Sequence, residues 1–350
     1  MKVIAWSGGA RGTRRRRSFS SVRCCGAGAI IALLCAVAAY GEDAAPLRLM
    51  QTFPLPGVEG RIDHLAIDLN GQRLFVAALG NDTVEVIDLQ TGTRNHSITG
   101  LHEPQGVSFA ADMNRLFVAN GRSGTVDIFD GTTFKSIGNV TLSDDADNLR
   151  YDAVGKRIYV GYGAGALGII DAQNGKRVGD IKLAGHPESF QIETAGPRIF
   201  VNVPDAKHIA VLDRQQSAVI GTWTVPQATA NFPLAVDEAH QRLFVGCRKP
   251  STLVVFDSTS GRPVTSLETA RDADDVFYDS TRRRIYVSGG EGVLEVIAQQ
   301  DPDHYVSVAR LPTAPGARTS LFVAELARLY LAVPHRGDQR AEIRVFATQP

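Results

Sequence analysis

A tetrapeptide of the form Arg, aliphatic, aromatic, aliphatic recurs seven times along this 350-residue chain, and its spacing constrains the fold more than any other feature. The copies begin at Arg73, Arg115, Arg157, Arg198, Arg242, Arg284 and Arg328, which lie 41 to 44 residues apart. A fixed period of about 40–45 residues, rich in strand formers, is typical of propeller blades with four strands each. The spacing therefore predicts an all-β fold, a seven-bladed β-propeller of four-stranded blades.

Each repeat divides into four short runs of strand formers separated by turn residues. In the second repeat the runs are residues 106–110, 115–119, 125–129 and 136–142, and β-branched and aromatic residues dominate them. The intervening segments are rich in Asn, Asp, Ser and Gly, which favour tight turns. The third run usually ends in Asp, and we expect that carboxylate to cap the turn that follows it.

The pattern from Arg115 to Gly121, together with residues 125–130, resembles the YVTN (YncE-like) family of β-propellers. The resemblance extends through all seven repeats. Where the family name has Thr-Asn, this chain has Ala77-Ala78, Ala119-Asn120 and Gly161-Tyr162. The resemblance implies an exported bacterial propeller that acts as a binding scaffold, in a group where many activities are unassigned.

The chain begins out of phase with the blades. Residues 47–55 match the fourth strands of the repeats, such as residues 176–183, whereas the chain ends after a third-type strand at residues 342–346. An unpaired sheet edge invites aggregation, and a closed ring removes it. We therefore predict that the N-terminal strand joins the last blade and closes the ring.

Residues 1–40 have the features of a secretory signal peptide. They hold seven Lys and Arg residues and no acid, followed by an apolar run from Gly26 to Ala39 that is too short for a confident membrane span. Cleavage near Ala38 to Gly41 would leave residues 41–350 as a single propeller domain, periplasmic or secreted, with no transmembrane span. Residues 16–19, Arg-Arg-Ser-Phe, also resemble a twin-arginine signal, so both export routes stay open.

Charge and cysteine content narrow the classes of partner. The chain holds 37 basic and 37 acidic residues, and loss of the seven leader cations leaves 30 against 37, a net charge of about −7. Bulk nucleic-acid binding needs a basic face, so a nucleic-acid partner is disfavoured. Of the four cysteines only Cys247 lies outside the leader, so no internal disulfide can form. We expect a monomer.

Candidate site residues lie just before the first strand of each blade, at what we call the lead-in positions. Unlike the scaffold positions, they differ from blade to blade, and in a propeller they share one face with the loops between second and third strands. We expect them to converge on the mouth of the central channel. The candidates are Asp63, His64, Gln105, Asp147, Asn148, Glu188, Asp274, Asp275 and Arg318.

Three chemistries fit this set. Asp147, Glu188 and Asp274 could bind Ca²⁺ or Mg²⁺ through carboxylate oxygens. The same carboxyl groups could act as general acid and base, or they could form a solvated rim. Cations of blades five and seven could also form a positive arc opposite the acids, which would suit a zwitterionic or anionic ligand; they are Arg248, Lys249, Arg318 and Arg336.

Two functions follow, and the sequence does not decide between them. One is a scaffold that binds a small molecule or an envelope protein in the periplasm. The other is a metal-dependent hydrolase or lyase, lactonase-like, with an acidic site at the channel mouth, an alternative that rests on fold analogy. The chain has no Cys-x₂-Cys metal pair, no Gly-x-Ser-x-Gly motif and no Gly-Lys-Ser/Thr phosphate loop.

Overall fold

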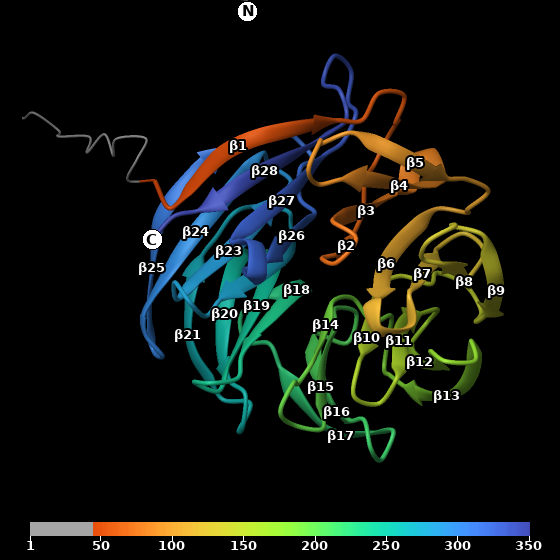
Figure 1. Cartoon of the computed structure of the whole chain (residues 1–350). Helices are drawn as coiled ribbons and strands as arrows, with labels where there is room; N and C mark the ends of the chain where they lie inside the picture. The colour runs from red at the N-terminus through yellow and green to blue at the C-terminus, as the bar shows by residue number, and fades with distance from the viewer. Residues whose placement is uncertain (1–44) are drawn as a thin grey trace, which may run out of the picture. The chain divides into compact units, whose positions relative to one another are not determined.

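The computed structural model describes residues 45–350, which form seven four-stranded antiparallel sheets (Figure 1). The signal peptide expected at residues 1–40 lies outside the described residues. The only helices among residues 45–350 are three single 3₁₀ turns: η2 (Leu79–Asn81), η3 (Ala111–Met113) and η4 (Ala324–Leu326). None of the helices in this part of the chain is long and apolar enough to cross a bilayer.

Each sheet is one blade, numbered here in chain order. Blade 1 holds β2 (Leu65–Asp68), β3 (Arg73–Ala78), β4 (Thr83–Asp88) and β5 (Arg94–Ile98). Blade 2 holds β6 (Pro104–Ala110), β7 (Arg115–Asn120), β8 (Thr125–Asp130) and β9 (Ser136–Thr141). Blade 3 holds β10 (Leu149–Asp152), β11 (Arg157–Tyr162), β12 (Ala166–Asp171) and β13 (Lys176–Lys182).

The remaining four blades repeat the pattern. Blade 4 holds β14 (Phe190–Ile192), β15 (Arg198–Val203), β16 (His208–Asp213) and β17 (Ala218–Thr224). Blade 5 holds β18 (Thr229–Asp237), β19 (Arg242–Lys249), β20 (Ser251–Asp257) and β21 (Pro263–Glu268). Blade 6 holds β22 (Ala273–Asp279), β23 (Arg284–Gly289), β24 (Val293–Asp301) and β25 (His304–Pro312). Blade 7 holds β26 (Ser320–Val323), β27 (Arg328–Val333), β28 (Glu342–Thr348) and β1 (Leu47–Pro54).

The first strands of successive blades contact one another in an unbroken ring, from β2 through β6, β10, β14, β18, β22 and β26 back to β2. A separate apolar core fills each of the seven gaps between neighbouring blades. The predicted seven-bladed, all-β fold is therefore confirmed.

The tetrapeptide recurs because its side chains alternate between the two faces of a blade. In blade 2, Leu116 and Val118 pack in the core shared with blade 1, whereas the aromatic Phe117 packs in the core shared with blade 3. The other aromatic residues of the repeat likewise face the next blade. Each copy therefore supplies apolar side chains to both of its neighbours.

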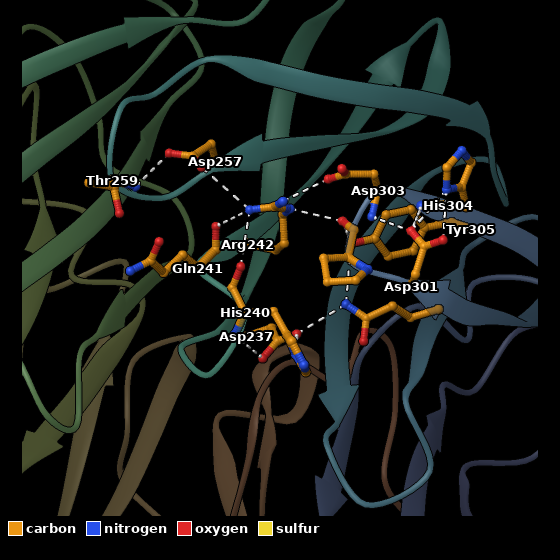
Figure 2. Close-up of polar contacts among 12 residues, drawn as sticks. Asp237, His240, Gln241, Arg242, Asp257, Thr259, Asp301, Asp303, His304 and Tyr305 are labelled. Carbon is orange, nitrogen blue, oxygen red and sulfur yellow. Dashed lines mark hydrogen bonds and ion pairs between the residues drawn. The ribbon is translucent and has the colours of Figure 1, made fainter.

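The arginine of the tetrapeptide connects blades. It lies two residues before the aromatic residue, on the same face of the strand, and in five blades it donates to a backbone carbonyl of the next blade. Figure 2 shows Arg242 of blade 5, which donates to the carbonyl of Pro302 in blade 6 at 2.8 Å and to the carboxylate of Asp303 at 2.6 Å. We call this contact the inter-blade arginine bond.

The ring closes as the sequence predicted. The strand β1 pairs antiparallel with β28, so the N-terminal strand is the outermost strand of blade 7 (Figure 1). Leu47 packs in the core between blades 6 and 7, and Phe53 packs in the core between blades 7 and 1. The register shift between Leu49 and Gln51 places Leu47 and Phe53 on opposite faces of β1. Leu49, before the shift, is 50% exposed.

A candidate ligand site at the channel mouth

Backbone hydrogen bonds fix the lead-in residues at the head of each first strand. The amides of Asp63, Asp147 and Glu188 donate to the carbonyls of Ala77, Gly161 and Asn202, at 2.7, 2.9 and 3.0 Å. Each acceptor belongs to the second strand of the same blade. Because the first strands contact one another around the ring, the lead-in side chains are held close to the central axis.

His64 lies between two buried carboxylates at the centre of the ring. Its Nε2 is 3.6 Å from Asp63 Oδ1, and its Nδ1 is 3.8 Å from Asp275 Oδ1 in blade 6. Burial lowers the pKa of His64, but the charges of Asp63, Asp275 and Asp147 outweigh burial and leave that pKa raised. The imidazolium form is thus favoured between the two acids.

The two acids beside His64 are themselves perturbed. Burial raises the pKa of Asp63 to about 6, against the attraction of His64 and Arg61. Burial also raises the pKa of Asp275, whose Oδ2 accepts a hydrogen bond from the amide of Ser320 at 2.8 Å. Because Ser320 begins the first strand of blade 7, this bond joins the Asp275 carboxylate of blade 6 to the backbone of blade 7.

Asp274 is clamped between two arginines from the neighbouring blades. Arg318 Nε lies 2.9 Å from Asp274 Oδ2, and Arg248 from blade 5 pairs with Asp274 Oδ1. Arg318 also donates to Asp272 at 3.1 Å. The expectation of a positive arc standing opposite the acids is therefore wrong for these two arginines, because each pairs directly with an acid.

Asp147 and Glu188 lie on a side of the mouth where the described residues make fewer direct polar contacts. Asp147 lies 3.8 Å from His186 Nε2, and Glu188 is only partly exposed. Burial raises the pKa of Glu188 to about 8, and the charges of Asp147 and Asp274 add to that effect. Burial lowers the pKa of His186, but the approach of Asp147 and the carbonyl of Gly163 reverse the shift and raise it to about 9. Near neutral pH, Glu188 is therefore largely a neutral acid beside a cationic imidazole.

Two of the predicted residues have other surroundings. Gln105 donates to the exposed Asp145 at 2.9 Å and so lies at the outer rim rather than with the acids. Asn148 is buried, with 3% of its surface exposed, and its Oδ1 has no hydrogen-bond partner within residues 45–350. The structure therefore groups Asp63, His64, Asp147, Glu188, Asp274, Asp275 and Arg318 through direct contacts and mutual charge effects.

Sequence reasoning missed two cations of this cluster. Arg61 donates to Asp63 at 2.6 Å, and it lies two residues before that lead-in position. Arg150 lies in β10 and acts electrostatically on His64 across the ring. A signal for Arg150 was present, because the aligned positions in the other first strands are the uncharged Ala66, Ser108, Gln191, Ala235, Phe277 and Leu321.

Two further observations bear on ligand binding: a second cleft, and the arrangement of possible metal ligands. A cleft of about 600 Å³ opens between blades 5 and 6, but its Arg271 and Arg310 each pair with Glu291 at 2.9 Å. Among residues 45–350, no group of three or more His, Cys, Asp or Glu side chains is arranged to hold a metal ion. The Ca²⁺ or Mg²⁺ expected at Asp147, Glu188 and Asp274 stays a prediction.

Comparisons with known proteins support the fold alone. No protein-family model matches the chain, and no curated protein matches it. Among solved structures, the chain is similar to a chain of Kuenenia stuttgartiensis hydrazine synthase, with a TM-score of 0.68, 16% identity, and coverage of 79% of this chain and 95% of that one. It is also similar to a chain of a mitotic checkpoint complex, with a TM-score of 0.73, 14% identity and coverage of 86% and 92%.

Proposed function

We propose that the protein is an exported, YVTN-like binding propeller that takes a small charged ligand at the mouth of its central channel. One observation carries the proposal: the buried Oδ1 atom of Asn148 has no hydrogen-bond partner among residues 45–350. Asn148 directly follows Asp147, whose charge acts on Glu188, and burial raises the pKa of Glu188 to about 8. Polar groups that converge on a concave opening are the default location of a binding site. The groups on the opposite face, such as Asp112, instead bond to one another, with Tyr151 donating to Asp112 at 2.8 Å.

The proposal is tested by a thermal-shift screen of charged metabolites, each added to purified residues 41–350. A ligand present at about 100 times its Kd adds roughly 2.7 kcal/mol to the folded state. We expect Asp147→Asn to abolish the shift caused by a hit, and Asp112→Asn, on the opposite face, to leave it unchanged. The reverse pattern would place the site on the other face. An envelope protein captured through the opposite face would overturn the proposal in the same way.

Export is a separate part of the proposal. It rests on the acid-free basic segment and the apolar run within residues 1–40. We expect the mature chain to begin between residues 39 and 42 and to fractionate outside the cytoplasm. N-terminal sequencing of the purified protein tests this, and an intact Met1 in the cytosolic fraction would contradict it.

A hydrolase or lyase is the second candidate, and the same glutamate favours it. A carboxyl group that is still protonated near neutral pH can act as a general acid. In a metal-dependent version, Asp147, Glu188 and Asp274 would supply the ligands, and Asp274 would have to exchange an arginine for the cation. Elemental analysis of the purified protein tests this version: one tightly held Ca²⁺ or Mg²⁺ per chain, lost in Asp147→Ala, would favour it.

A further inference from the structure

Buried polar groups near the channel differ in whether they find a partner among residues 45–350. Arg248 of blade 5 and Arg318, just before blade 7, both pair with Asp274 of blade 6. In blade 3, the Oδ1 atom of Asn148 has no partner among the described residues, although Asn148 is only 3% exposed. A buried acceptor without a partner costs roughly 1–3 kcal/mol, so such a group calls for an explanation.

The repeat shows where the Asn148 side chain points. Asn148 directly precedes the first strand of blade 3, as His64 does in blade 1, and both residues accept a hydrogen bond from the second strand of their blade. The side chain of His64 extends to the centre of the ring, where it meets Asp275 of blade 6. The equivalent backbone geometry directs Asn148 into the same space.

Arg150 lies two residues further on, on the same face of the extended chain as Asn148. Its guanidinium donates to the carbonyl of Leu149 at 2.9 Å and lies 5.6 Å from the ring of Phe190. The charges of Asp147 and Asp275 both act on the Arg150 guanidinium. A guanidinium has five N–H donors, and among the described residues one acceptor is bonded to it.

These groups match the two ends of an amino acid. We propose that this part of the channel binds the ammonium and carboxylate groups of a free α-amino acid, with Arg150 pairing the carboxylate and Asn148, Asp147 and Glu188 accepting from the ammonium. An ammonium has three N–H donors, and those three side chains supply three acceptors. Arginine pairs with a carboxylate through two parallel hydrogen bonds. The inference rests on the proposed function and specifies its ligand.

The experiment is isothermal titration of residues 41–350 with each of the twenty free L-amino acids at pH 7. Ethylammonium chloride and sodium propionate serve as probes for the ammonium and carboxylate halves of the ligand. We expect at least one amino acid to bind at least tenfold more tightly than either half-probe. Binding of ethylammonium as tight as that of the best amino acid would overturn the role of Arg150.

Variants separate the roles of the groups. Asn148→Ala and Arg150→Lys should each weaken amino-acid binding at least tenfold. The control is Asn70→Ala, an exposed asparagine on the opposite face, which should bind as the wild type does. If Arg150→Lys does not fold, Asn148→Ala and the comparison with the two half-probes still test the inference. If no amino acid binds but another metabolite binds in an Asp147-dependent manner, this inference fails and the proposed function stands.

Discussion

The imidazole of His64 in blade 1 lies 3.8 Å from the carboxylate of Asp275 in blade 6. The contact therefore joins two blades that are separated in the ring by blade 7. With Asp63 at 3.6 Å on the other ring nitrogen, one cation is shared by two buried acids. Such an arrangement ties non-adjacent blades together through charge at the point where the ring closes. It also makes the fold dependent on a residue that the repeat does not require.

His64→Leu should destabilise the protein by about 3–5 kcal/mol, because it leaves two buried carboxylates without their shared cation. The matched control is His304→Leu, which removes a histidine–aspartate pair whose imidazole is 73% exposed, and should cost less than about 1 kcal/mol. Urea unfolding at pH 7 measures both. Equal decreases in the free energy of unfolding of the two variants would show that the central position of His64 does not add to stability.

The raised pKa of His64 sets the direction of the pH dependence. The folded protein holds the His64 proton more tightly than the unfolded chain, so the stabilising contribution is complete below pH 6.5 and is lost as pH rises through the folded pKa. Wild type and His64→Leu should therefore converge as pH rises from neutrality past that value. A difference that grows in alkali would contradict the assignment.

Glu188 should make the protein less stable as pH rises. Its pKa is about 8 in the folded chain and 4.5 in the unfolded one, so the folded state binds more protons between those values and stability falls across that window. Glu188→Gln should match wild type below pH 4.5 and exceed it at pH 9 by on the order of 3 kcal/mol. Denaturant unfolding at both pH values tests this. Glu325→Gln, an exposed control on η4, should show no such divergence.

The inter-blade arginine bond predicts that replacing the arginine lowers stability by different amounts at equivalent positions of the repeat. Arg242→Met removes bonds to Pro302 and Asp303 of the next blade, and should cost about 2–3 kcal/mol since hydrogen bonds to charged groups are worth about 1.5–3 kcal/mol each. Arg328→Met removes a bond to Ala327 within its own blade, 3.1 Å long, and should cost less than about 1 kcal/mol. Chemical denaturation compares the two, and a larger loss for Arg328→Met would refute an inter-blade role.

The fold was predictable from sequence because the repeat carries it. The copies that begin at Arg73 and Arg115 show the same alternation, so the blade count and the ring closure follow from spacing and phase. The position of the mouth also follows, since Asp63 and Asp147 depart from the repeat at equivalent places. What the arginine of each copy does was not predictable, because its partner lies in the next blade, about 60 residues away.

The details of the site depend on three-dimensional pairing that spacing does not specify. Arg318 and Asp274 are predicted residues, but their direct contact at 2.9 Å depends on side-chain direction across two blades. Variation at the lead-in positions does not identify Arg150, because Arg150 lies inside the first strand of its blade. Its charge among apolar and uncharged equivalents was the available signal.

The closing strand β1 provides the last prediction, in which two apolar residues of one strand should behave oppositely. Phe53 is 2% exposed and packs in the core between blades 7 and 1, so Phe53→Ala should cost about 3–5 kcal/mol. Leu49, in the same strand, is 50% exposed next to the register shift, so Leu49→Ala should change stability by less than about 0.5 kcal/mol. Deleting residues 46–55 should be more damaging than either substitution, because it also exposes the edge of β28. Thermal unfolding of the three variants tests the closure: an unchanged melting temperature in the deletion would show that β1 does not hold the ring together.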